Sequence, residues 1–254
     1  AHHVPRLLEA AEGRVLGSRG ARVLLIAMDY IDGFSAGRLS LEEKMSEFTC
    51  KSILCDVCTA LSRLHECGLI HRDVKGDNVI VAMSGRSFLC DFGLSVFQQN
   101  LRGRDGQIQR CGSPFFMAPE LMGAEPQYSD KSDMWALGIM GIEIATGQPP
   151  HSDESIKDMK VLFEFIALSK KPHMQSAEGF TRRYSELLSA WLIRDARRRA
   201  SALETMQSPL LRFDVDKVHH AVGHWLAKVC RNAPSCGSGA SPHARSPRSP
   251  QCRQ

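Results

Sequence analysis

Two short polar motifs constrain this chain more than any other feature of its sequence. The first is His-Arg-Asp-Val-Lys-Gly-Asp-Asn at residues 71–78, and the second, thirteen residues after Asn78, is Asp91-Phe92-Gly93. Carboxylate and amide oxygens are ligands that suit Mg²⁺, and an Asp can accept the proton of a hydroxyl group. Together the motifs predict a site at which a divalent cation helps to move a phosphate onto an alcohol.

Apolar runs and their spacing predict both strands and helices. Residues 23–28 form a continuous apolar run of strand length, which is typical of a buried strand. Between 46 and 66 apolar residues recur three and four positions apart, which indicates one face of a long helix, and Gly68 suits its left-handed cap. We expect strands at 5–11, 23–29, 79–82 and 87–90, and helices at 46–66, 133–145 with Ser132 as N-cap, 155–168, 183–192, 202–206 and 215–229.

Composition supports a folded chain and argues against some partners. The 254 residues are 43% hydrophobic, and the net charge of +4 gives no strong case for nucleic-acid binding. No apolar run approaches the roughly 18 residues of a membrane span. Nine scattered cysteines indicate reduced thiols, and the Cys55–Cys58 pair lacks the second close pair that a zinc site needs. We therefore expect a cytoplasmic chain without nucleic-acid or membrane partners.

A third block, Ala-Pro-Glu at 118–120, completes a set that resembles eukaryotic protein kinases over roughly residues 3–213. Lys75, two residues after Asp73, is similar to Ser/Thr kinases, and the segments at 76–78, 115–120 and 147–151 look most like the STE group, which includes kinases of MAP-kinase cascades. The resemblance implies an α+β kinase-like fold with a mostly helical large lobe and a truncated small-lobe sheet. It also implies ATP, Mg²⁺, a protein substrate, and upstream or downstream kinases as partners.

The resemblance implies a role for each polar residue of the two motifs. Asp73 would orient the substrate hydroxyl and accept its proton, and Lys75 would neutralise charge on the transferring phosphate. Asn78 and Asp91 would hold Mg²⁺ against the nucleotide phosphates. Asp-Asn pairs are also common in turns, but the matched order and spacing favour the chemical role.

The strand expected at 23–29 resembles the one that leads into the hinge of a kinase nucleotide pocket, here residues 29–33. The implied contacts are Met28 at the back of the adenine site, the backbone of Asp29 and Ile31 at the adenine edge, Ile80 as the apolar floor, and Cys90 just below the phosphates. Met28 also fits plain core packing, because apolar strand residues are buried by default.

The resemblance further implies contacts that assemble the site. We expect Ser113 to bridge Asp73 and Lys75, Glu120 to pair with a buried Arg199, Asp133 to cap the backbone of the 71–78 loop, and His71 to stack with Phe92 and with Leu8.

The segment 94–117 departs from the family pattern. Its only hydroxyl residues are Ser95 and Ser113, whereas related kinases often carry a phosphorylatable residue in the stretch equivalent to 107–111. Arg72 is the side chain that would receive such a phosphate. We therefore expect activity that does not depend on phosphorylation of this segment.

The upstream region departs further, because the first lysine is Lys44, already past the expected hinge. The glycines between 13 and 20 lack the G-x-G-x-x-G spacing of a phosphate loop, and we expect a simple turn there. The chain thus starts within the small lobe. It is either part of a longer active Ser/Thr kinase or a truncated pseudokinase that serves as a docking scaffold.

We assign residues 1–231 to a kinase domain, with a partial N-lobe at about 1–30, the hinge at 29–33 and the C-lobe at 34–231. Residues 232–254 are rich in Ser, Pro, Gly and Arg and are expected to be a disordered tail. A small-molecule phosphotransferase of similar fold is a third alternative. The Ala-Pro-Glu block and the helix around Trp135 argue against it, because they build a platform for a protein substrate.

Overall fold

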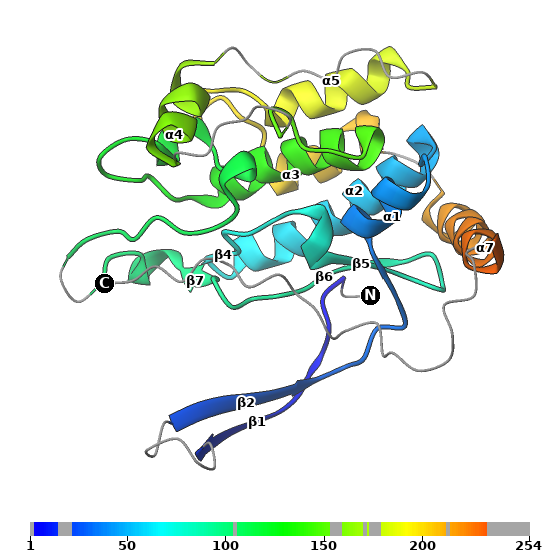
Figure 1. Ribbon diagram of the computed structural model, residues 1–254, viewed down its shortest axis with the longest axis horizontal. Coiled ribbons are helices and arrows are strands. Elements are labelled where there is room, and N and C mark those ends of the chain that lie inside the picture. Colours follow the sequence, from blue (N-terminus) through cyan, green and yellow to red (C-terminus); the bar gives the residue numbers. More distant parts are fainter. Residues whose placement is uncertain are drawn as a thin grey trace.

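The computed structural model describes residues 3–14, 22–103, 106–152, 159–169, 172, 179–211 and 214–232. A group of helices forms the body of the molecule, and a two-stranded hairpin projects away from it (Figure 1). The expected tail lies almost entirely outside the described residues, as do most of the predicted turn at 13–20 and the start of the helix predicted at 155–168.

The strands are β1 Leu7–Arg14, β2 Arg22–Met28, β3 Gly33–Ser35, β4 Leu69–Ile70, β5 Val79–Ala82, β6 Ser87–Leu89 and β7 Val96–Phe97. The α-helices are α1 Ala36–Glu42, α2 Glu47–Glu66, α3 Asp130–Thr146, α4 Met159–Leu168, α5 Arg182–Trp191, α6 Ala202–Gln207 and α7 Val215–Asn232. The predicted elements are present within a few residues. Helix α1 and the strands β3, β4 and β7 were not predicted.

The hairpin of β1 and β2 has no covering layer among the described residues. The strands pair antiparallel, with Leu7 opposite Met28 and Gly13 opposite Val23. Apolar side chains of β2 remain exposed, as the values for Leu24 (63%) and Ile26 (52%) show. The expectation of a buried strand at 23–28 is therefore wrong, because two strands bury an apolar face only when another layer packs against it.

The core lies between α2 and α3 (Figure 1). The predicted stripe on α2 is confirmed, since Leu54, Val57 and Leu61 are fully buried. Helix α3 begins earlier than expected. Its N-cap is Ser129, and Ser132 completes a capping box, so the prediction of Ser132 as N-cap is wrong.

The two cysteines of the CxxC pair lie on the buried side of α2. Both are free thiols, and burial raises the pKa of Cys55 to about 12 and that of Cys58 still further. These thiols are therefore neutral and act as small apolar groups in the core.

Two strand pairs bring the polar motifs together. Strands β5 and β6 pair with Val79 opposite Leu89, which sets the loop before β5 beside the loop after β6. Strands β4 and β7 pair with Leu69 opposite Phe97, which joins the two ends of the segment that carries both motifs. The paired strands therefore place the 71–78 loop and Asp91 next to each other.

Helix α7 packs against α2 through a buried polar contact. Both oxygens of Asp56 on α2 lie 3.0 Å from Nε2 of His219, and one of them accepts the N–H of Ser87 at 2.7 Å. Asp56 thereby ties α2 and α7 to strand β6. No helix in the described part of the chain is long and apolar enough to cross a membrane.

Candidate active site

One buried carboxylate from α3 holds the backbone of the 71–78 loop. The N–H groups of His71 and Arg72 each donate to Asp133 at 2.9 Å, and Asp133 is 2% exposed. Arg72 has a φ of 68°, a strained conformation for a non-glycine residue that persists only where its surroundings compensate. The expected capping by Asp133 is confirmed, and it helps to place Asp73.

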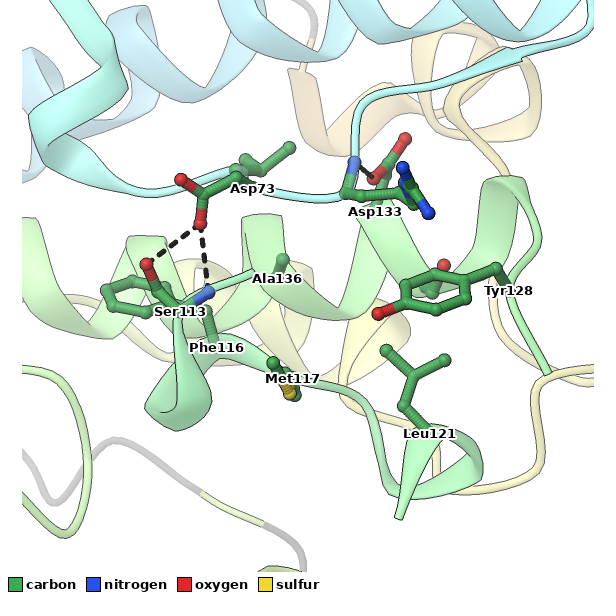
Figure 2. A pocket seen from close by; sticks show the side chains of 11 residues that line it. Asp73, Ser113, Phe116, Met117, Leu121, Tyr128, Asp133 and Ala136 are labelled. Atoms are coloured by element: carbon green, nitrogen blue, oxygen red, sulfur yellow. Dashed lines mark hydrogen bonds between the residues drawn. The ribbon is translucent and has the colours of Figure 1, made fainter. Parts of the chain in front are cut away.

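The carboxylate of Asp73 is the centre of a hydrogen-bond network. Its Oδ1 accepts the backbone N–H of Ser113 at 2.9 Å and the Ser113 hydroxyl at 2.8 Å (Figure 2). Its Oδ2 lies 3.0 Å from Nζ of Lys75 and accepts Nδ2–H of Asn78 at 2.9 Å. Lys75 also donates to Oγ of Ser113 at 2.8 Å. The expected bridge through Ser113 is therefore confirmed.

This network keeps Asp73 ionised at neutral pH. Burial acts to raise the pKa of the carboxyl group, but the charge of Lys75 and hydrogen bonds from Ser113, Lys75 and Asn78 outweigh burial and hold the pKa below its ordinary value. A carboxylate with a low pKa is a weak base, so it takes a proton only from a hydroxyl that is already losing it. Asp73 is thus suited to orient a hydroxyl at least as much as to deprotonate it.

Asn78 and Asp91 present oxygen atoms that fit a divalent cation. The amide nitrogen of Asn78 donates to the carbonyl and the carboxylate of Asp73, which directs the amide oxygen away from them. The N–H of Cys90 donates to the carbonyl of Asn78 at 2.8 Å and brings the next residue, Asp91, beside the loop. The carboxylate of Asp91 is exposed and accepts the N–H of Gly93 at 3.1 Å. One amide and one carboxylate oxygen suit Mg²⁺.

A pair of rings, of which His71 is fully buried and Phe92 half-buried, links the two motifs. His71 and Phe92 pack edge to face with centroids 5.1 Å apart, as expected. Burial lowers the pKa of His71 against the opposing effect of nearby carboxylates, Asp133 first, so the ring is neutral at pH 7. Leu8 was expected to extend the stack. It is 55% exposed on the projecting hairpin, so that expectation is wrong.

Two of the residues expected around the nucleotide lie close to the loop motifs. Ile80 is half-buried on β5, between Ser35 of β3 and Phe88 of β6. Cys90 follows β6, and burial raises the pKa of its thiol to about 11, so the thiol is neutral at pH 7. Both residues could therefore form an apolar floor next to Asn78.

The other three residues lie at and after the end of β2. Met28 is 46% exposed, so it does not pack into a core within the described residues. The N–H of Asp29 donates to the carbonyl of Arg6 at 2.9 Å. Ile31 is half-buried on the segment that leads to β3.

Sequence reasoning missed Glu143, a buried carboxylate beneath the catalytic loop. It is 9% exposed on α3, and its Oε2 accepts the N–H of Gly76 at 2.9 Å. Burial raises the pKa of Glu143 to about 7, with Asp77 adding to the rise and Lys75 opposing it. A single acidic residue inside the apolar run of this helix was the available signal.

Glu143 should make stability fall as pH rises toward neutrality. The pKa of Glu143 is about 7 in the folded protein, whereas the ordinary value of 4.5 applies to the unfolded chain. The folded state therefore binds the proton more tightly. The resulting stabilisation is full below about pH 4.5 and is lost as pH rises through 7. Glu143→Gln removes the charge and keeps an acceptor oxygen. We expect it to be more stable than the parent above pH 7, by on the order of 3 kcal/mol.

Urea denaturation at several pH values measures this difference, which should vanish near pH 4.5. Glu186→Gln on α5, at an exposed glutamate paired with Arg182, is the matched control. Its stability should differ from the parent by less than about 1 kcal/mol. A pH-independent gap between the parent and Glu143→Gln would contradict the assignment.

A buried ion pair fixes the end of the substrate-side loop, residues 112–120. Arg199 is 1% exposed and donates to both carboxylate oxygens of Glu120, at 2.7 and 2.9 Å. Its guanidinium also donates to the carbonyl of Lys131 and lies over the ring of Trp135, 5.0 Å from the centroid. The expected pair is confirmed, and it anchors the loop to the start of α3.

Fold and site together have a kinase-like architecture of mixed α+β type, in which a mostly helical body carries a small hairpin sheet. A family model of the protein kinase domain matches residues 6–211, and the chain belongs to this family. The predicted fold class is confirmed.

Curated relatives are Ser/Thr kinases of STE20 type. Serine/threonine-protein kinase max-2 of Caenorhabditis elegans is 31% identical over 74% of this chain and 28% of its own length. PAK mbt of Drosophila melanogaster is 30% identical over 83% of this chain and 32% of its own length. The ste20 kinase of Aspergillus oryzae is 31% identical over 78% of this chain and 23% of its own length. The chain therefore spans less than a third of each of these relatives.

Proposed function

We propose that this chain is a Ser/Thr protein kinase that transfers the γ-phosphate of ATP to a hydroxyl group of a protein. The single observation that carries the proposal is the convergence of Lys75, Asn78 and Ser113 on the carboxylate of Asp73. A carboxylate base that is held in place beside the ammonium group of a lysine suits the transfer of a phosphoryl group to an alcohol. Relatives that are named Ser/Thr kinases support the same reading.

In this proposal Asp73 and Lys75 have different tasks. Asp73 orients the substrate hydroxyl and accepts its proton as the new bond forms, because its oxygens are held in place by Ser113 and Asn78. Lys75 lies between Asp73 and Ser113, where its ammonium can neutralise charge that develops on the phosphate.

The proposed ligands follow from the same geometry. Asn78 and Asp91 are the residues that would hold Mg²⁺, which when bound neutralises phosphate charge. For ATP we propose the backbone of Asp29 and Ile31 at the adenine edge and Met28 behind it. Ile80 and Cys90 would then lie beneath the nucleotide.

We also propose the domain assignment of 1–231 as a kinase domain, with hinge 29–33, followed by a tail. A place in a MAP-kinase type cascade is proposed on the similarity to ste20 of Aspergillus oryzae and to PAK mbt. Other kinases would then be its upstream or downstream partners.

A docking scaffold without transfer activity is the second candidate. The exposed apolar side chains of β2, including Leu24 and Leu25, suit contact with another protein. The two candidates differ in whether Mg²⁺ and ATP bind.

Mg²⁺-ATP should raise the melting temperature of the chain. At a tenfold excess over Kd, binding stabilises a protein by about 1.4 kcal/mol, which corresponds to roughly 3–6 °C for a domain of this size. Differential scanning fluorimetry with ATP, with and without Mg²⁺, measures the shift. Asp91→Asn should abolish the Mg²⁺-dependent part, because it removes the proposed carboxylate ligand.

Asp77→Asn is the control, since Asp77 is an exposed carboxylate of the same loop and should leave the shift intact. No shift with saturating Mg²⁺-ATP in the parent would favour the scaffold. Equal shifts in the parent and Asp91→Asn would remove the metal assignment while keeping nucleotide binding.

A further inference from the structure

The segment between Ser95 and Ser113 contains no Ser, Thr or Tyr. A phosphate therefore cannot be placed on a hydroxyl residue between them to pull this segment toward Arg72. If the substrate-side loop is to be held in one arrangement, contacts that need no phosphate between these two serines must hold it. The structure provides such contacts around Tyr128, which was not singled out in the sequence.

Arg72 is already engaged without a phosphate. Its Nε–H donates to the carbonyl of Leu94, and its guanidinium lies over the ring of Tyr128, 5.4 Å from the centroid. Cation–aromatic contacts of this kind stabilise a half-buried guanidinium. The ring of Tyr128 thus occupies one face of the side chain that would otherwise receive an anion.

The hydroxyl of Tyr128 holds the backbone of Cys111, the residue just before the substrate-side loop. Its oxygen accepts the N–H of Cys111 at 2.8 Å, and its hydrogen is donated to the carbonyl of Cys111 at 2.6 Å. Tyr128 is 5% exposed and immediately precedes the cap of α3. One phenol therefore satisfies both backbone groups of a loop residue and fixes it to the core helix.

The residues that follow Cys111 connect this contact to Asp73. Gly112 follows Cys111 with a φ of 108°, and a Cβ on it would lie 2.4 Å from the carbonyl oxygen of Arg72, so the loop passes directly over the catalytic loop. The next residue, Ser113, donates twice to Asp73. Figure 2 shows Tyr128 and Ser113 along the same cavity.

Two further residues hold the segment before Cys111. Ile108 packs against the apolar core. The Nε–H of Arg110 donates to the carbonyl of Leu121 at 2.7 Å, and its guanidinium lies over the ring of Phe163, 4.8 Å from the centroid. No phosphate takes part in any of these contacts.

We propose that Tyr128 is a positioning residue that keeps Ser113 on Asp73 without phosphorylation of the 94–117 segment. The inference rests on the proposed kinase function, because the position of Ser113 matters only if Asp73 takes part in phosphate transfer. The contact itself can be tested without measuring phosphate transfer. Tyr128 acts through Cys111 and Ser113 and does not touch the reacting groups.

Tyr128→Phe keeps the ring over Arg72 and removes only the hydroxyl. We expect amide exchange, followed by NMR on the whole ¹⁵N-labelled chain, to be about tenfold faster at Cys111 and at least threefold faster at Ser113. Treatment of the parent with a Ser/Thr phosphatase should change neither of these readouts.

Tyr184→Phe is the matched control, because the buried Tyr184 also donates one hydrogen bond to a backbone carbonyl, that of Gly141, at 2.7 Å. It should leave amide exchange at Cys111 and Ser113 unchanged. Faster exchange at Cys111 alone would reduce Tyr128 to a packing residue and overturn the proposal. A phosphatase-induced change at Ser113 would overturn it as well. Nucleotide binding by the same samples reports separately on the proposed function.

Discussion

Replacing Glu120 with Gln is expected to lower the free energy of unfolding by about 3–5 kcal/mol, because the substitution strands a buried charge. Arg199 is 1% exposed and loses the carboxylate that accepts two of its N–H groups. The neighbouring carbonyl groups of Lys131 and Ile193 satisfy other N–H groups but do not neutralise the charge. Urea denaturation measures the loss.

A matched control is available at the surface. Arg38 and Glu42 form a pair of similar length, 2.7 Å, with side chains 53% and 47% exposed. Glu42→Gln should cost less than about 1 kcal/mol, because water screens the pair.

The double variant Glu120→Leu/Arg199→Met should recover most of the stability lost in Glu120→Gln, since no buried charge remains in it. If Glu120→Gln cost no more than Glu42→Gln, the buried pair would not anchor the loop. The stabilising role assigned to Glu120 would then be wrong.

Replacing Asp73 with Asn is expected to slow phosphate transfer to a protein hydroxyl by about 10²–10⁴-fold, the usual range for loss of a positioned base. The amide keeps the size of the side chain and can still contact Ser113. It cannot take a proton, and it no longer pairs with the charge of Lys75.

Single-turnover assays with excess enzyme and radiolabelled Mg²⁺-ATP measure the effect. Asp77→Asn changes the charge of the same loop without touching Asp73 and should retain transfer. Parallel losses in both variants would mean that the rate follows loop charge and not the base. Unchanged transfer in Asp73→Asn would exclude Asp73 from the proposed role.

The contacts around the catalytic loop were predictable because the motifs resemble those of protein kinases, and that resemblance implies which residues pair. Three expected contacts appear in the structure: Lys75 with Asp73, the buried Arg199 with Glu120, and Asp133 with backbone N–H groups of the 71–78 loop. Polar groups that leave water must find partners, so motif identity constrains the pairing strongly.

Burial and helix boundaries were less predictable. The apolar run at 23–28 has the composition of a buried strand, yet more than half of Leu24 is exposed. Ser129 and Ser132 are both good caps by type, and only the start of the buried helix decides between them. Exposure depends on which layers pack nearby, and a single segment does not contain that information.

The chemistry of the site follows from the sequence alone. The oxygen ligands of Asp73, Asn78 and Asp91, and the spacing of these residues, restrict what the site can bind. Three other properties depend on the folded structure: the raised pKa of Glu143, the hydrogen bonds between Tyr128 and Cys111, and the pairing of β4 with β7. These properties arise between residues far apart in sequence, through burial and a few hydrogen bonds. Local patterns do not encode such contacts, because packing sets them.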